Sequence, residues 1–465
     1  MSDSVAGLCR LTVKAPDASF ELGVPVDVTL ADLLPVLVDH GGGDLHDQGL
    51  EHGGWTVQRL GQAPLDEEGT PRSLDLRDGE TLYLRARNET LPEVAVDDIV
   101  AGVAEVLRGR GDTWNAGLAR RVLLGLAVAA LAGGLATLAL PGTEAVRAGV
   151  AAGMAVLLVL CAAAASRAVG DAGGGGALGV MAVPYLALAG ALAPTGAGHE
   201  TMTGARLLAA GAAGAGASVL ALAAVAACAP LFLGAFTAAL LAAAGGVAVA
   251  CGLSLPQAAA VVAVLAVVVG GLVPGLAFRM SGLRLPLLPS NAEQLQEGIE
   301  PHAPQFVASR AALADGYLTA LYAALGLVTA ACATVLLSVD RTGSAAGWPV
   351  PVLVLVLSAL LLLHARNVGS LWQRLSLVVP GGYGPLLAAV LAAVHGGMPE
   401  RLLLVAVLAV AAAAAAIAAW TVPGRRLVPY WGRIGDLLQT TCAVMLVPLV
   451  VLIAGAYHHL RGLKG

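Results

Sequence analysis

Charged side chains are scarce in this 465-residue sequence. Asp, Glu, Lys and Arg together make up 12% of it, whereas hydrophobic residues make up 58% and the mean hydropathy is +0.81. An average soluble domain carries about a quarter charged residues. Most of the chain therefore cannot face water, which excludes a wholly soluble globular protein.

Hallmarks of disulfide-rich, secreted and nucleotide-binding proteins are missing too. The six cysteines have no paired spacing, which argues against a disulfide framework or a thiolate metal site. The opening "MSDSVAGLCRLTVKAPD" has neither a basic start nor a long apolar run, so we expect the N-terminal part not to be exported. The glycine-rich "GDAGGGGALG" at 170–179 lacks the Lys-Ser/Thr ending of a P-loop, and we interpret it as a flexible turn.

Ionisable residues inside the apolar segments, which ion-driven transporters usually need, are nearly absent. We interpret the ones at predicted span ends as structural interfacial residues rather than relays or ligands; they are Asp315, Asp436, His364 and His395. His458 and His459 follow the last span and fit a solvated tail. No acidic pair and no Ser/His/Asp set is recognisable. The sequence thus predicts no enzyme activity and no catalytic, cofactor-binding or metal-ligating residues.

The charge that is present is unevenly distributed. Residues 1–118 hold 21 of the 31 acidic and 9 of the 26 basic residues, a net of −12, and residues 119–465 hold the other 10 and 17, a net of +7. This division predicts an acidic, water-facing head followed by a membrane body. The acidity suits docking on a basic partner surface, or it merely keeps the head away from anionic lipid.

Residues 1–90 have the pattern of a small α+β domain, here called the head. Two alternating runs, 8–14 and 19–24, flank a turn, which is typical of a hairpin. A helix is predicted after the N-cap Thr29, ending at Gly41, and further strands at 54–60 and 81–87. This order favours a ubiquitin-like β-grasp, with a generic α+β sandwich as the alternative.

Residues 91–118 connect the head to the membrane body. Val96, Ile99, Val100, Val103 and Leu107 recur at helical spacing and predict a short amphipathic linker helix. Such a helix could lie on the membrane surface, pack on a partner or pack on its own head, and the sequence does not separate these possibilities.

The body, residues 119–465, contains about eleven apolar runs of the length that a bilayer requires. The predicted spans are 120–140, 148–166, 174–193, 206–227, 231–250, 257–278, 315–338, 349–365, 375–394, 402–421 and 437–457. Only "CAP" at 228–230 separates the fourth span from the fifth, so these two could also form one long broken segment. Together they predict an all-α polytopic bundle.

Basic residues set the expected orientation. With the head in the cytoplasm, thirteen basic residues flank the spans on that side and six on the other. The cytoplasmic set is Arg108, Arg110, Arg120, Arg121, Arg167, Arg279, Arg284, Arg310, Arg366, Arg374, Arg425, Arg426 and Arg433. An odd number of spans then places the C-terminus outside, and a cytoplasmic loop is expected at 279–314, with a short helix capped by Ser290 and Glu293.

Small residues in the spans suggest close helix packing. Gly149 and Gly153, and likewise Gly271 and Gly275, form GxxxG pairs, while Gly211 and Ala215 have the same spacing. Such pairs are frequent by chance in Ala- and Gly-rich helices, so each one alone is a weak signal. Five tryptophans near span ends fit the headgroup zone of a bilayer.

Four segments together resemble the EccD family, the multi-spanning component of type VII (ESX) secretion systems. "GGWTVQRLGQAPLD" (53–66) and "LRDGETLYLRAR" (76–87) are similar to strands of the family's head. "DDIVAGVAEV" (97–106) resembles its helix before the membrane, and "GLRLPLLPSNAEQL" (282–295) its Pro-rich loop after the sixth span. The likeness covers nearly the whole chain.

The resemblance implies a structural subunit that scaffolds an export channel in the inner (plasma) membrane. It implies copies paired as dimers around a lipid-filled space, and a cytoplasmic head near an EccC-type ATPase, with EccB and EccE as further partners and no nucleic acid. The head would then be a docking module. The alternatives are a secondary transporter or permease with a regulatory head, and a membrane enzyme, which the missing polar constellations disfavour.

Overall fold

The structure is a computed structural model that describes residues 7–16, 18–42, 45, 48–49, 53–87, 114–195, 199–283, 303–338, 348–421 and 429–455. The chain divides into two compact units, Met1–Asn115 and Ala116–Gly465. Each unit is described by itself below.

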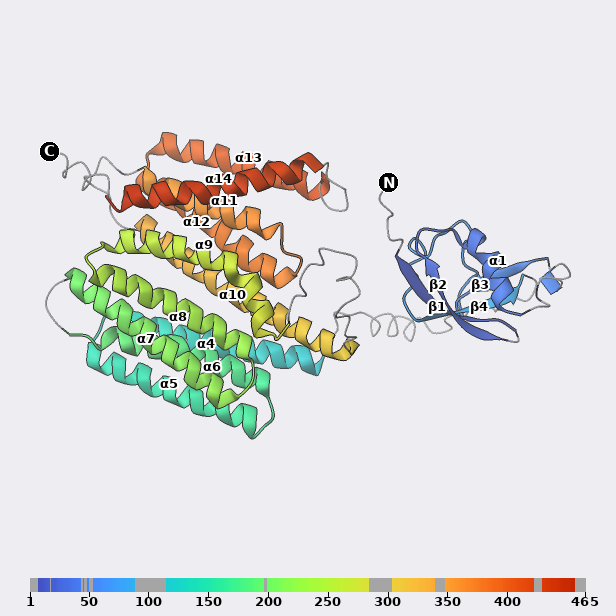
Figure 1. Cartoon of the computed structure of the whole chain (residues 1–465), viewed down its shortest axis with the longest axis horizontal. Helices are drawn as coiled ribbons and strands as arrows, with labels where there is room; N and C mark the ends of the chain where they lie inside the picture. Colours follow the sequence, from blue (N-terminus) through green and yellow to red (C-terminus); the bar gives the residue numbers. More distant parts are fainter. Residues whose placement is uncertain are drawn as a thin grey trace, which may run out of the picture. The chain divides into compact units, whose positions relative to one another are not determined.

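The first unit is built on one four-stranded sheet (Figure 1). Its elements are β1 (Leu8–Lys14), β2 (Ser19–Pro25), α1 (Leu30–His40), β3 (Trp55–Gln58) and β4 (Glu80–Ala86). The strand order is β2-β1-β4-β3, and the central pair β1–β4 is parallel whereas the outer pairs are antiparallel. A parallel central pair with α1 in the crossover is the ubiquitin-like arrangement, so the predicted β-grasp is confirmed.

Alternation along the strands determines which side of this sheet α1 covers. Leu11 and Val13 of β1 and Leu82 and Leu84 of β4 are buried in one core together with the apolar side of α1. Because successive strand residues point to opposite faces, the residues between them lie on the face opposite α1, here called the open face. The helix begins where expected: the Thr29 hydroxyl caps it by accepting from the Asp32 amide at 3.4 Å.

The second unit is a bundle of eleven apolar helices within the described residues. They are α4 (Ala116–Ala139), α5 (Glu144–Arg167), α6 (Ala172–Leu192), α7 (His199–Val225), α8 (Ala229–Ala250), α9 (Leu255–Met280), α10 (Pro304–Ser338), α11 (Pro349–Ala365), α12 (Leu371–His395), α13 (Met398–Thr421) and α14 (Pro429–Ile453). Ten are long and apolar enough to cross a membrane, and α11 has 17 residues. Each coincides with a predicted span.

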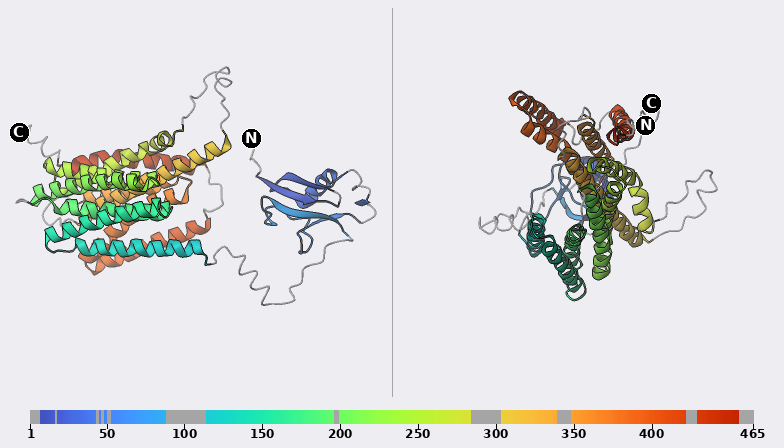
Figure 2. Two further views of the ribbon diagram at one scale, coloured as in Figure 1. Left: turned by 90° about the horizontal axis from the view of Figure 1, so that it is seen from below. Right: turned by 90° about the vertical axis from the view of Figure 1, so that its left-hand side faces the viewer.

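Helix α10 is central in this bundle. It packs against α8 and α9 on one side and against α12 and α11 on the other (Figures 1 and 2). The helices α5–α8 form one flank, and α11–α14 form the other. In contrast, α4 and α13 bury no residue inside the chain, so their apolar surfaces are left to lipid or to other chains.

The uncertain boundary between the fourth and fifth spans is a true break. Ala226 and Cys228 have φ values of 55° and 56°, a left-handed conformation that α-helices do not tolerate. The chain therefore reverses there, and α7 and α8 form an antiparallel hairpin rather than one broken segment.

The predicted loop at 279–314 is too long at both ends. Helix α9 continues to Met280, and α10 already begins at Pro304, so Asp315 lies eleven residues inside a 35-residue helix and not at its start. The first part of α10 was not predicted because it contains polar residues such as Gln305 and Arg310. Hydropathy identifies apolar spans and not the polar extensions of the same helices. The linker helix within 91–118 and the short helix at Ser290 lie outside the described residues.

Arginine, the dominant cation, serves mainly to finish helices. The last four carbonyls of a helix have no intrahelical donor, and arginines from neighbouring turns donate to them. Arg147 donates to Leu138 and Ala139 of α4, and Arg167 to Ala223 and Ala224 of α7. Arg374 does the same for α11, and Arg401 for α12. These arginines thus supply the hydrogen-bond donors that carbonyls at the helix ends lack, at the level where we expect the spans to meet water.

Of the three predicted small-residue contacts, one is made inside this chain. A Cβ added to Gly211 of α7 would overlap the backbone of α8 at Ala243, so this glycine permits close contact within the hairpin. A Cβ at Gly149, Gly153, Gly271 or Gly275 would meet no described atom within 4 Å. Those two GxxxG pairs therefore do not pack α5 or α9 against described parts of the same chain.

Candidate functional site

Two places in the molecule gather polar groups that the fold alone does not require. The first is the open face of the sheet in the head. Arg10 and Lys14 on β1 are exposed there, and Arg85 on β4 is half-buried. The Lys14 ammonium lies over the ring of Tyr83, 5.7 Å from its centroid, a cation–π contact between paired residues of β1 and β4.

The three cations on the open face make no ion pair with a described residue, whereas the other described arginines of the head do. Those pairs are Arg59–Glu80, Arg72–Asp27, Arg77–Asp75 and Arg87–Glu67. A domain that is acidic overall therefore presents three cations on the open face, where β2 adds the exposed carboxylate of Glu21 opposite Thr12 of β1, so this face is basic on balance. Net charge alone suggested a basic partner, and the local arrangement favours an acidic one at this face.

The Arg59–Glu80 pair is the most enclosed of these, with about a fifth of each side chain exposed. Burial alone would raise the pKa of Glu80. The hydrogen bonds from Arg59 Nε at 2.6 Å and from the Arg77 amide at 2.8 Å outweigh it and hold the pKa of Glu80 below its usual value. The pair ties β4 to the end of β3.

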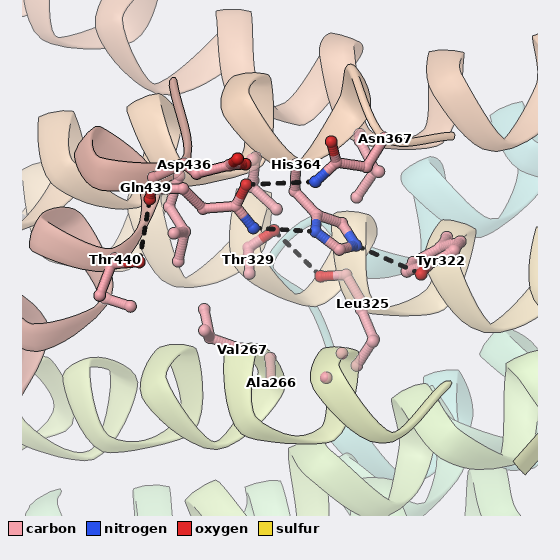
Figure 3. Close-up of a pocket in the computed structure, with 16 residues that line it drawn as sticks. Ala266, Val267, Tyr322, Leu325, Thr329, His364, Asn367, Asp436, Gln439 and Thr440 are labelled. Carbon is pink, nitrogen blue, oxygen red and sulfur yellow. Dashed lines mark hydrogen bonds between the residues drawn. The ribbon is translucent and has the colours of Figure 1, made fainter. Parts of the chain in front are cut away.

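The second place is a cavity of about 450 Å³ within the membrane unit. Its walls come from four helices that are distant in sequence, α9, α10, α11 and α14, with Leu377 of α12 at one edge. Figure 3 shows polar side chains along one side of the cavity, facing Ala266 and Val267 of α9 across it. A cavity of this size falls within the range of small-ligand pockets.

A row of hydrogen bonds crosses three helices at this cavity (Figure 3). Asn367, just after α11, donates its Nδ2 to Gln439 Oε1 of α14 at 3.3 Å. Gln439 Nε2 in turn lies 3.3 Å from His364 Nδ1, and His364 Nε2 lies 3.2 Å from the hydroxyl of Tyr322 on α10. Because the Gln439 amide donates to Nδ1, the neutral imidazole carries its hydrogen on Nε2 and donates it to Tyr322.

Ionic contacts brace the same end of the bundle. Arg366 Nη2 donates to Asp436, and Arg366 Nη1 donates to the Gly432 carbonyl at 3.1 Å, which joins α11 to the start of α14. On α12, the buried Gln373 donates to Asp315 Oδ1 of α10 at 2.6 Å. These bonds hold α10, α11, α12 and α14 in fixed rotations about their axes. They thereby position the hydrogen-bonded row of side chains at the cavity.

The structure assembles residues that the sequence treated singly. His364 and Asp436, interpreted as separate interfacial residues, both line the cavity, while His395 is elsewhere and contacts the Leu391 carbonyl of its own helix. His458 and His459 lie outside the described residues. Sequence reasoning missed Tyr322, Asn367 and Gln439. The one available signal was the helical spacing of Asp436, Gln439 and Thr440 on the last span.

The groups of this row form hydrogen bonds. No group of three His, Cys, Asp or Glu side chains able to hold an ion occurs among the described residues. The row offers amide, imidazole and hydroxyl groups at one end of a mostly apolar cavity, which Asp436, Thr329 and Thr440 also line, and this combination suits an amphipathic ligand.

Comparison with known proteins agrees with the architecture of both units. The membrane unit matches the family model for the EccD-like transmembrane domain over residues 119–463. The head matches the model described as WXG100 protein secretion system (Wss), protein YukD, over residues 8–84. The two matched regions together cover most of the chain.

Whole-chain relatives extend the match. The ESX-4 secretion system protein eccD4 of Mycobacterium tuberculosis, in strains CDC 1551 / Oshkosh and ATCC 25618 / H37Rv, is 30% identical over 497 residues, which cover 100% of this chain and 99% of the relative. Protomer 1 of the ESX-3 core complex has a TM-score of 0.57 at 20% identity, covering 97% of this chain and 99% of that one. A chain of the MycP5-free ESX-5 inner membrane complex, State II, has a TM-score of 0.55 at 19% identity, covering 89% and 99%.

The structural likeness shows the fold, and the family model together with the full-length relatives shows the family. This chain belongs to the EccD family and is a multi-pass structural membrane subunit of a type VII (ESX) secretion system.

Proposed function

We propose that this subunit scaffolds the export channel and uses its head to dock cytoplasmic partners, among them an EccC-type ATPase. The basic open face carries the proposal, because Arg10, Lys14 and Arg85 make no ion pair with a described residue in an otherwise acidic domain. Complementary charge speeds and orients association. The partner surface for this face is therefore acidic.

The assembly proposed around the chain includes a second copy of it, with EccB and EccE as neighbouring subunits. The helices α4 and α13, which bury no residue fully within the chain, support this, since much of their apolar surface is available for contacts within the membrane. The relatives whose structures are solved come from a core complex and an inner membrane complex. The chain is proposed to lie in the inner membrane and to have no catalytic activity of its own.

The head is proposed to be cytoplasmic and the C-terminus extracytoplasmic. The thirteen-to-six bias of basic residues supports this orientation. Eleven helices, an odd number, then carry the chain from one side to the other.

Charge reversal on the open face tests the docking role. In the full secretion complex, Arg10→Glu with Lys14→Glu is expected to reduce co-purification of the ATPase at least ~10-fold while membrane insertion persists. The matched control is Arg72→Glu with Arg77→Glu. It changes the net charge by the same amount, in the segment between β3 and β4 and not on the strands that form the open face. Equal recovery of the ATPase with both double variants would refute docking at this face.

A further inference from the structure

We infer that the cavity between α9, α10, α11 and α14 holds one acyl chain of a membrane phospholipid, with its ester and headgroup region against the row Asn367–Gln439–His364–Tyr322. The site lies within a single chain. The lipid-filled space that the family resemblance implies lies instead between two copies.

The lining is graded from polar to apolar. Asn367 follows the end of α11, and Asp436 stands in the second turn of α14, so the polar end lies near the helix ends where headgroups are found. Away from that end the walls include Ala266, Val267, Leu325, Leu360 and Ala443. Thr329 and Thr440 also line the cavity, but their hydroxyls donate to carbonyls of their own helices. A ligand with a polar group at the interface and a hydrocarbon chain in the interior matches both parts.

The hydroxyl hydrogen of Tyr322 has no acceptor within the part of the chain that the structure describes. Its hydroxyl accepts from His364 Nε2–H, and no acceptor for its own hydrogen is recorded among the described residues. The side chain is only 4% exposed, so a missing acceptor is costly. An ester carbonyl or a phosphate oxygen entering the cavity would supply that acceptor.

The dimensions favour a hydrocarbon chain over a protein segment. An α-helix with its side chains is about 10–12 Å across. An acyl chain is far narrower, and it needs no hydrogen-bonding partners along its length. Both properties favour an acyl chain as the occupant.

The wall on α9 is kept open by two glycines. A Cβ on Gly271 would meet no described atom within 4 Å, and one on Gly270 would make an ordinary 3.6 Å contact with Leu325. Neither glycine is required for close helix packing, in contrast to Gly211. What they provide is width on the α9 side of the cavity.

Open space at the Cβ position of glycines on α9 provides a matched pair of variants. Gly271 lines the cavity and Gly275, one turn further along α9, does not, yet both have open space at the Cβ position. Gly271→Leu should fill the cavity without displacing a neighbour, and Gly275→Leu adds the same side chain outside it. Tyr322→Phe removes the hydroxyl and keeps the ring.

The test is native mass spectrometry of the purified full-length chain after delipidation and addition of a defined phospholipid. Phosphatidylethanolamine and phosphatidylglycerol are added in separate samples, with a free fatty acid as a third arm. The wild type and Gly275→Leu are expected to retain one lipid. Gly271→Leu should lower that occupancy at least ~10-fold, and Tyr322→Phe several-fold.

Thermal unfolding without lipid shows whether each variant is folded. If Gly271→Leu does not fold, the lipid occupancy of Tyr322→Phe tests the site instead. Retention of fatty acid alone would mean that the polar row does not recognise the headgroup region, and that part of the inference would fall. Equal retention by wild type, Gly271→Leu and Tyr322→Phe, or equal loss with Gly271→Leu and Gly275→Leu, would place the bound lipid elsewhere and overturn the site.

Discussion

The guanidinium of Arg366 lies against the backbone of α14 at Gly435. A Cβ built on Gly435 would overlap Nη1 of Arg366. The same guanidinium donates to Asp436 and to the Gly432 carbonyl. Three positions of α14, Gly432, Gly435 and Asp436, therefore contact this one side chain. Because Gly435 has no side chain, the Arg366 guanidinium at the end of α11 can reach α14.

We expect Gly435→Ala to destabilise the membrane unit by up to about 1 kcal/mol, because the group in the way is the far end of the flexible Arg366 side chain and the main loss is its partly exposed contacts with α14. The new Cβ must displace Arg366 from Asp436 and Gly432. The measurement is the thermal unfolding midpoint of the purified chain in detergent. Gly432→Ala is the matched control, because a Cβ there meets no described atom within 4 Å.

A double-mutant cycle isolates the cause. In an Arg366→Ala background the clash is gone, so Gly435→Ala should cost much less than it does in the wild type. Identical effects of Gly435→Ala in both backgrounds would show that its cost has nothing to do with Arg366.

The strands of the head and the positions of the spans could be predicted because their signals are local. Strand β1 was predicted at 8–14, its observed bounds, since apolar and polar residues alternate along it and a turn follows. Eleven runs long enough for a bilayer likewise mark the eleven helices. In both cases a few neighbouring residues contain the whole pattern.

The cavity could not be predicted because it depends on helix rotation. Tyr322, His364 and Gln439 come from three different spans, and nothing near any one of them indicates that their side chains meet. The glycines also show that contacts depend on helix rotation. Gly149 and Gly211 occur in equally suggestive patterns, yet only Gly211 faces another helix of this chain.

The contact at Gly211 gives a second prediction. Gly211→Ala would force α7 away from α8, because the Cβ would overlap backbone atoms of Ala243 that cannot rotate aside. We expect a loss of about 1–3 kcal/mol and a lower unfolding midpoint. Gly216→Ala on the same helix is the control, since its Cβ finds open space. A Gly211→Ala chain as stable as Gly216→Ala would contradict the close hairpin contact.

The Arg59–Glu80 pair predicts how the stability of the head depends on pH. The pKa of Glu80 is lower in the folded state than its usual value of 4.5. Its contribution to stability is therefore present above about pH 4.5 and is lost as the pH falls through the folded-state pKa. Glu80→Gln should cost about 1 kcal/mol at neutral pH, and the difference from wild type should shrink towards pH 3.

Urea unfolding of residues 1–90 measures this difference, because the head has its own hydrophobic core and Trp55 is the one tryptophan in that segment. Glu21→Gln is the matched control: Glu21 is exposed on β2 and has no ion pair with a described residue. A Glu80→Gln penalty that stayed constant from pH 7 to pH 3 would contradict the assigned role of the carboxylate.

The last prediction concerns orientation. With an odd number of spans and basic residues concentrated beside the head, a fluorescent protein joined to the N-terminus should fluoresce, because it folds in the cytoplasm. Alkaline phosphatase joined after Gly465 should be active, because it needs an oxidising exterior. Moving the phosphatase to the segment between α9 and α10 should abolish its activity and serves as the internal control. Active phosphatase at that segment, or an inactive fusion at the C-terminus, would reverse the assignment of sides and place the open face of the head out of reach of a cytoplasmic ATPase.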